Sequence, residues 1–324
     1  MSSLFIVGNG FDIAHGIPTK YSDFRTFIIK NYPDALKYRD EIISLLDYKY
    51  INEKEFAAEI LLSTMDKVGG ENWNNFEEAL AYIDFSNKLP RPNHKEDETE
   101  EEDNILMKDY LLYMDILTSG FIQCTKYWQD FFQLWIREVQ IQIKLDTYAR
   151  KENLRKIFNE PDMLYFTFNY TKTLEKLYRI KGVTHIHNYV GQQLVFGHGQ
   201  DDVMYGEDEI DLMLGSSFLD DMVLKFRKDT DFPLIKHKKF FKKLSYDINK
   251  VYSYGFSYGD VDSVYIKRII KSIAPDAVWN FTTFEANDSA DLDIKKNKLR
   301  DWGFNGILIY MKVDFYYVGN IVTK

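Results

Sequence analysis

The segment that most constrains the fold is Leu4 to Pro18, LFIVGNGFDIAHGIP, near the start of the 324-residue chain. Its apolar, strand-like run stops at Gly8, and a turn with two glycines follows. Gly8 and Gly10 allow backbone to approach a ligand closely, and the N–H groups of such a turn can bind an anion. The pattern is typical of the start of a nucleotide site. The alternative is a tight turn without a ligand, although Asn9 and Asp12 add polar groups that such a turn does not need.

The spacing of these glycines excludes two familiar nucleotide sites. The GxG lacks the third glycine of the dinucleotide fingerprint, and no GK[ST] follows it, so the segment is neither a Rossmann dehydrogenase motif nor a P-loop.

Length and composition indicate a large folded unit with a sizeable core. The chain exceeds the usual length of a single domain, and 45% of its residues are hydrophobic and 16% aromatic. The formal charge is −9. Residues 95–103 (KEDETEEED) contribute −6 of this charge, because they contain seven acids and one lysine. The remaining sequence is only mildly acidic, so its net charge gives no support for nucleic-acid binding.

Cysteine content and the first residues predict a cytoplasmic protein. Cys124 is the only cysteine, which excludes an intramolecular disulfide and a four-cysteine zinc site. The N-terminal residues MSSLFIVGNG show no signal peptide, and no later segment is apolar enough to predict a transmembrane helix.

The order of the predicted elements indicates an α/β fold. Residues 22–151 show mainly helical periodicity, with a core-type aromatic stripe near its end and the acidic run 95–103, which we interpret as a solvated loop. Helical patterns separate several of the later strand-like segments, which are 163–168, 183–187, 194–196, 250–254, 278–281 and 306–310. We therefore predict one α/β domain over residues 1–324, with a largely parallel sheet covered on both faces and a helical insertion at about 22–151.

Ligands of parallel sheets bind beyond the carboxyl ends of the strands. Polar or glycine-bearing clusters follow four predicted strands, and these are Gly8-Asn9-Gly10, Asn169-Tyr170-Thr171, Gly197-His198-Gly199, and Gly255-Phe256-Ser257 with Asp260 beyond it. His185 and His187 lie at the end of their own predicted strand.

Six motifs in register carry a resemblance over nearly the whole chain. GNGFDIAHGIPTKYSDF, WNNFEEAL, FNYTKTLEKLY, HIHNYVG, FGHG and GFSYGDVD resemble the AbiH family of bacterial phage abortive-infection proteins. At greater distance, the same order is similar to the sirtuin-like NAD-consuming domains of antiphage systems. The resemblance implies a Rossmann-like, sirtuin-like domain in a defence effector that hydrolyses NAD and needs no metal. The partners expected for such an effector are NAD or a related nucleotide, a phage-derived trigger or a partner defence protein, and further copies of the same chain.

The resemblance also implies roles for individual residues. It makes Gly8, Asn9, Gly10 and Asp12 the phosphate and ribose turn, shaped on its far side by Pro18 and Thr19. Asn169 would orient the nicotinamide ribose or the attacking water, and His187 would be the catalytic base. The adenosine half would contact Gly255, Ser257 and Asp260. A histidine that titrates near neutral pH suits the required proton transfer.

Two departures from the sirtuin pattern affect these roles. A single cysteine cannot build the structural zinc module of sirtuin deacylases, which disfavours deacylation and leaves NAD hydrolysis open. The sirtuin His-Gly pair is His187-Asn188 here, and Asn tolerates positive φ better than most residues. An intact pair follows at His198-Gly199, so the base could be His185, His187 or His198.

Simpler interpretations exist for the same side chains. His187 could be a structural hydrogen-bonding group of the sheet, Asn169 could cap the helix near Lys172, and Asp260 could cap the helix at Val261. His185 and His187 alternate along one strand, so both would point to one face and could bind a metal with His198 and a carboxylate. Glu175 and Asp262 are predicted to be surface charges.

The main rival hypothesis comes from residues 236–250, KHKKFFKKLSYDINK. Lysines surround Phe240 and Phe241, as in a basic surface with stacking aromatics, which would suit a nucleic-acid-binding or nuclease effector. The alternative is one amphipathic helix over 238–248 that buries Phe240, Phe241 and Leu244. For a metal nuclease, Asp201 and Asp202 are the best candidates. A third hypothesis is a helical interaction module that senses phage components.

Overall fold

The computed structural model describes residues 2–38, 52–83, 108, 120, 123, 125–143, 148, 150–200, 223–245, 247–283 and 289–312. The chain divides into two compact units. The first comprises Met1–Thr19, Ile136–Val195 and Asp229–Lys324, and the second comprises Lys20–Trp135 and Phe196–Lys228. Expectations about the acidic run 95–103, Cys124 and the pair Asp201 and Asp202 lie outside the described residues.

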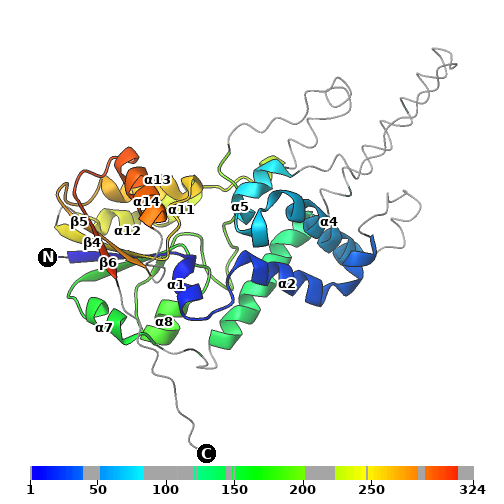
Figure 1. The fold of residues 1–324 in the computed structure, drawn as a ribbon, viewed down its shortest axis with the longest axis horizontal. Coiled ribbons are helices and arrows are strands. Elements are labelled where there is room, and N and C mark those ends of the chain that lie inside the picture. Colours follow the sequence, from blue (N-terminus) through cyan, green and yellow to red (C-terminus); the bar gives the residue numbers. More distant parts are fainter. Residues whose placement is uncertain are drawn as a thin grey trace, which may run out of the picture. The chain divides into compact units, whose positions relative to one another are not determined.

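The first unit is built on a six-stranded sheet in which every pair of neighbours is parallel (Figure 1). The strands are β1 (Ser2–Val7), β2 (Met163–Thr167), β3 (Thr184–His185), β4 (Ile248–Tyr254), β5 (Val278–Thr283) and β6 (Ile307–Lys312), in the order β3-β2-β1-β4-β5-β6. This order is that of a doubly wound, Rossmann-like sheet. The predicted fold class, a largely parallel α/β sheet, is confirmed.

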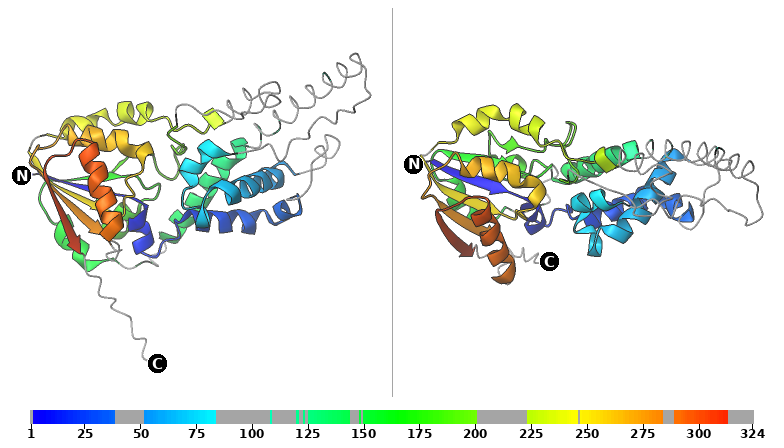
Figure 2. Two further views of the ribbon diagram at one scale, coloured as in Figure 1. Left: turned by 45° about the horizontal axis from the view of Figure 1, so that its top comes forward. Right: turned by 90° about the horizontal axis from the view of Figure 1, so that it is seen from above.

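Helices cover both faces of this sheet (Figure 1 and Figure 2). One face carries α11 (Asp231–Lys236), α12 (Lys238–Lys243), α13 (Ser263–Ile270) and α14 (Ser289–Asp301), and the other carries α1 (Asn9–Ala14), α7 (Glu152–Phe158) and α8 (Thr173–Tyr178).

The apolar run of β1 has no alternating polar residues, because both faces of this strand are buried. Leu4 and Ile6 belong to the core under α12 and α13, whereas Phe5 and Val7 belong to the core under α7 and α8. Successive side chains of a strand point to opposite faces, and both faces are covered here. Each of these four side chains is therefore buried.

The strand register brings three turns to one edge of the sheet. Val7, the last residue of β1, pairs with Thr167 at the end of β2 and with Tyr254 at the end of β4. The chain segments that follow these residues therefore begin at the same level. The strand order reverses between β1 and β4, where open parallel sheets commonly bind ligands.

Most of the described residues of the second unit are helical. Its elements are α2 (Tyr21–Asn31), η1 (Pro33–Tyr38), α4 (Glu53–Val68), η2 (Glu71–Trp73), α5 (Phe76–Ala79), η3 (Leu80–Tyr82) and the part of helix 125–143 up to residue 135. The ring of Phe24 lies 5.1 Å from Trp135 and 5.3 Å from Phe132, measured between ring centroids. The described part of the aromatic stripe is thus core, as predicted, and the aromatic residues before residue 120 fall outside the described residues.

Three predicted elements differ from the structure. Residues 194–196 are not a strand, because the Val195 N–H donates to the His187 carbonyl in a loop contact rather than to a neighbouring strand. Strand β3 ends at His185, and the chain then turns. The helix predicted over 238–248 ends at Lys243, because Leu244 is extended and β4 begins at Ile248.

Among the described residues, no helix is both long and apolar enough to cross a membrane.

Candidate functional site

The glycine turn after β1 is pressed against the turn after β4. A Cβ atom on Gly8 or Gly10 would lie 2.5 to 2.7 Å from the Gly255 backbone, and Gly255 has φ +62°. The Gly10 N–H donates to the Gly255 carbonyl, and the Gly8 N–H donates to the Tyr254 carbonyl. The glycines thus allow the two turns to cross. The N–H groups of Gly8 and Gly10, which were expected to bind an anion, instead donate to backbone carbonyls.

Asn9, Pro18 and Thr19 form the far side of the same loop. The exposed Asn9 side chain donates from Nδ2 to the Thr19 carbonyl at 2.7 Å, which ties the start of α1 to the chain ten residues later. Thr19 is buried, and its hydroxyl has no hydrogen-bond partner among the described residues. Pro18 is partly exposed beside it.

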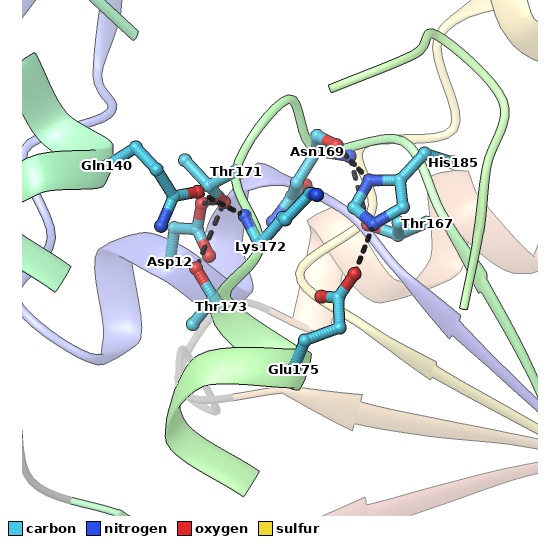
Figure 3. A network of polar contacts seen from close by, with 9 residues as sticks. All are labelled: Asp12, Gln140, Thr167, Asn169, Thr171, Lys172, Thr173, Glu175 and His185. Carbon is cyan, nitrogen blue, oxygen red and sulfur yellow. Dashed lines mark hydrogen bonds and ion pairs between the residues drawn. The ribbon is translucent and has the colours of Figure 1, made fainter. Parts of the chain in front are cut away.

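Asp12 lies at the centre of a buried polar cluster (Figure 3). Its Oδ2 atom accepts a 2.5 Å hydrogen bond from the Thr171 hydroxyl, which in turn lies 3.0 Å from the Thr173 hydroxyl. Burial raises the pKa of Asp12 to about 6, although Thr171, Thr173, Asn169 and the charge of His185 act in the opposite direction. The other carboxylate oxygen, Oδ1, has no hydrogen-bond partner within the described chain.

Asn169 belongs to this cluster and does not cap a helix. Its backbone N–H donates to the Thr167 hydroxyl, and its side chain is close enough to lower the pKa of Asp12. Helix α8 has Lys172 at its N-cap, so the capping alternative is wrong. The side chain is buried, and its Nδ2 and Oδ1 atoms make no hydrogen bond to any described residue. Buried amides are rarely left without partners, which marks Asn169 as a candidate ligand contact.

His185 is held between two oxygen acceptors. Its Nδ1 atom lies 3.1 Å from the Asn169 carbonyl, and its Nε2 atom lies 2.9 Å from Oε1 of Glu175 on α8 (Figure 3). A neutral imidazole has only one N–H, so both contacts are hydrogen bonds only when a second proton is shared with Glu175. Glu175 is therefore a partner of a buried histidine, and its prediction as a surface charge is wrong.

His187 is held by a second carboxylate. Its Nε2 atom lies 3.0 Å from Oδ1 of Asp262, and its ring packs against Phe168 and Tyr265. The side chain of Asp262 is only 17% exposed, so its prediction as a surface charge is also wrong.

The two histidine side chains contact different helices and do not share one face of a strand, contrary to the prediction. His185 contacts α8, whereas His187 packs on Tyr265 of α13. Alternation within a strand does not apply, because the strand ends at His185 and the chain turns through His187. Asn188 completes this turn with φ 64°, as expected for the residue that replaces glycine. Among the described residues, no three His, Cys, Asp or Glu side chains come together as a metal site.

His198 has a structural environment in the second unit. Its Nε2 atom lies 2.9 Å from the Val223 carbonyl, and its Nδ1 atom accepts from the Gln200 N–H. The imidazole is therefore neutral with its proton on Nε2, and burial lowers its pKa.

Ser257 and Asp260 are exposed at the turn after β4. Asp260 lies in η5 (Asp260–Asp262), where Gly259 is the N-cap, and its carboxylate accepts from Lys298 at 3.1 Å. The capping alternative for Asp260 is therefore wrong. Ser257 makes no side-chain hydrogen bond within the described chain.

The basic segment 236–250 buries its aromatic rings. Phe240, Phe241 and Leu244 are 6 to 8% exposed and belong to the core of the first unit. Stacking on nucleic-acid bases needs an accessible ring face, and these rings have none. The amphipathic interpretation is confirmed for these three residues.

Sequence reasoning missed three side chains that define the site. Glu175 and Asp262 were visible only as acids in amphipathic segments, and Gln140 lies within the aromatic helix 125–143. The amide oxygen of Gln140 accepts from the Lys172 N–H at 2.7 Å, and its Nε2 atom has no partner in the described residues. No local pattern distinguishes any of the three.

Fold and site together define a Rossmann-like α/β protein with a buried polar cluster at the carboxyl edge of its sheet. Residues 4–283 match the sequence model of the family described as bacteriophage abortive infection AbiH. The chain therefore belongs to the AbiH family, and the resemblance inferred from six motifs is confirmed. Searches of curated proteins and of solved structures gave no match.

Proposed function

We propose that this AbiH-family protein is a phage-defence effector that hydrolyses NAD at the bond between nicotinamide and ribose. The observation that carries the proposal is the pair Asp12 and Asn169, whose buried polar atoms lack partners within the described chain at the carboxyl edge of a Rossmann-like sheet. Keeping such groups costs stability, so they are expected where a ligand uses them.

The chemistry of these groups fits a ribose. Asp12 Oδ1 can accept a hydrogen bond from a ribose hydroxyl, and the Asn169 amide can both donate and accept. An ionised Asp12 would also stabilise the positive charge that develops on the ribose as nicotinamide leaves with the bonding electrons. The gap around Asn169, Thr171 and His185 is too narrow for a water molecule, so substrate entry requires these side chains to move.

A carboxylate-held histidine supplies the proton transfer. We assign the role of general base to His187, with Asp262 fixing its orientation, so that the proton of the attacking water passes to the imidazole. His185 is the second candidate, but its two nitrogens already face Asn169 and Glu175.

The test is nicotinamide release from NAD by the purified protein, together with NAD content in phage-infected cells that express it, because an effector can be silent until triggered. We expect Asn169→Ala and His187→Gln to lower the rate by about 10²- to 10⁴-fold. Asp262→Asn should also lower the rate, because the carboxylate that orients the His187 ring is lost. The exposed Asp276→Asn is the matched control and should leave the rate unchanged.

Absence of nicotinamide release in vitro and of NAD loss in infected cells would refute the proposal. Salt-sensitive DNA or RNA binding that is lost on replacing Lys238, Lys239, Lys242 and Lys243 would then support the nucleic-acid hypothesis. Pull-down of one specific protein by the full chain would instead support the interaction module.

A further inference from the structure

A cationic cavity lies beside the polar cluster, within the first unit. It has a volume of about 260 Å³ and is lined by Arg137, Gln140, Ile141, Lys172, Lys176, Val190 and Gly191. This lining contains three cations and no acid. The cavity is much larger than the roughly 30 Å³ that one water occupies in the liquid.

Two helices place the cations. Arg137, Gln140 and Ile141 are spaced i, i+3 and i+4 on helix 125–143, so they share one of its faces. Lys172 is the N-cap of α8 and Lys176 lies in its last turn, so the two like charges are spaced i and i+4 and repel each other.

No described carboxylate compensates these charges. Arg137 and Lys176 make no ion pair or side-chain hydrogen bond within the described residues, and the Lys172 ammonium lies 3.7 Å from the centre of the Tyr189 ring. Arg137 and Lys176 are exposed and Lys172 is half-buried, and a bound anion would relieve the repulsion between the three cations.

Gln140 supplies a second, independent indication of a ligand. Gln140 is only 3% exposed, yet its Nε2 atom has no hydrogen-bond partner in the described chain. The Lys172 N–H can only donate, so the atom it meets at 2.7 Å must be the amide oxygen (Figure 3). The two N–H groups of Gln140 are therefore left for another acceptor.

We infer that this cavity binds the phosphate groups of a nucleotide, with Arg137, Lys172 and Lys176 neutralising the charge and Gln140 donating from Nε2. The inference depends on the proposed function only for the nucleotide to which the phosphates belong. It also gives the phosphates a place apart from the glycine turn, where the Gly8 and Gly10 N–H groups are occupied. Lys172 follows Thr171, which binds Asp12, so the two sites adjoin in the chain.

The test is titration calorimetry of the full chain with ADP, inorganic pyrophosphate and adenosine at two salt concentrations. We expect ADP and pyrophosphate to bind, adenosine to bind much more weakly, and added salt to weaken the binding. The double variant Arg137→Gln/Lys176→Gln should raise the Kd for ADP about tenfold or more. The exposed pair Lys267→Gln/Arg268→Gln removes the same charge from α13 and should change the Kd less than about twofold.

A variant of Gln140 tests the buried donor separately. Gln140→Glu keeps an oxygen for the Lys172 N–H and replaces the donor by a carboxylate oxygen, so it should also weaken ADP binding about tenfold or more. Circular dichroism and the melting temperature establish that each variant is folded.

Three results would overturn the inference. These are an undetectable affinity of the wild type for ADP and pyrophosphate, equal binding of adenosine and ADP, or equal weakening by the two double variants. Failure of NAD hydrolysis with these binding results intact would remove the proposed reaction and leave the phosphate site in place.

Discussion

Burial changes the acid–base behaviour of Asp12 more than any hydrogen bond does. Its pKa rises from 3.8 to about 6 even though hydroxyl groups and His185 favour the ionised form. The folded chain therefore holds a proton between about pH 4 and pH 6 that the unfolded chain has released. Ionised Asp12 lowers the free energy of unfolding above this window by an amount on the order of 3 kcal/mol.

Asp12→Asn should consequently stabilise the protein while it removes function. We expect the free energy of unfolding to rise by about 1 to 3 kcal/mol at pH 8 and the difference from the wild type to vanish near pH 4. Urea unfolding at both pH values measures this. His15, whose pKa burial lowers to about 4, titrates in both proteins and cancels in the comparison.

The exposed Asp276→Asn is the control for this measurement and should show no such pH-dependent gain. A destabilised Asp12→Asn variant at pH 8 would mean that the carboxylate is better satisfied than its contacts indicate.

The pairing of His185 with Glu175 can be tested by its contribution to stability. Glu175→Ala leaves the Nε2 atom of the buried His185 without its partner at 2.9 Å, so the free energy of unfolding should fall by about 1 to 3 kcal/mol. Urea unfolding at neutral pH measures this. The exposed Glu78→Ala is the control, and equal effects of the two variants would show that Glu175 behaves as a surface charge.

At the scale of elements, the crossing of the turns after β1 and β4 depends on Gly255. A Cβ atom there would lie 2.3 Å from the Phe11 nitrogen, and φ is +62°. Gly182 also has a positive φ, +75°, but a Cβ atom on it would meet nothing within 4 Å. An alanine at Gly182 therefore measures the cost of the positive φ alone, whereas an alanine at Gly255 adds the cost of the steric clash.

Gly255→Ala should lower the free energy of unfolding by about 3 kcal/mol or more, and Gly182→Ala by about 1 kcal/mol. Denaturant unfolding at neutral pH compares them. Equal effects would show that conformational strain alone accounts for the loss and that the turns can separate without cost.

For the whole sheet, strand order predicts a gradient of local stability. β1 and β4 lie at the centre with both neighbours paired, whereas β3 has two residues and β6 is an edge strand with Ile307 and Ile309 exposed. Native-state hydrogen exchange should give the largest opening free energies in β1 and β4 and the smallest in β3 and β6. Similar protection in all six strands would contradict this order.

The sequence by itself determined the class of fold, because hydrophobic periodicity is local. The unbroken apolar run of β1 requires two covered faces, and the later alternation of strands and helices requires parallel neighbours. The motifs that follow strands also located Asp12 and Asn169 at the sheet edge and identified the family. The roles of Asn169 and His187 in NAD cleavage remain predictions.

Only the tertiary structure decided which polar groups meet. Glu175 lies ten residues from His185, and Asp262 lies 75 residues from His187, and nothing in the local sequence distinguishes these acids from surface charges. Glycines also have the same sequence signature whether they face a ligand or another turn. Contacts between distant segments depend on how strands and helices pack, so the histidine partners, the turn crossing and the cationic cavity appear only in the folded chain.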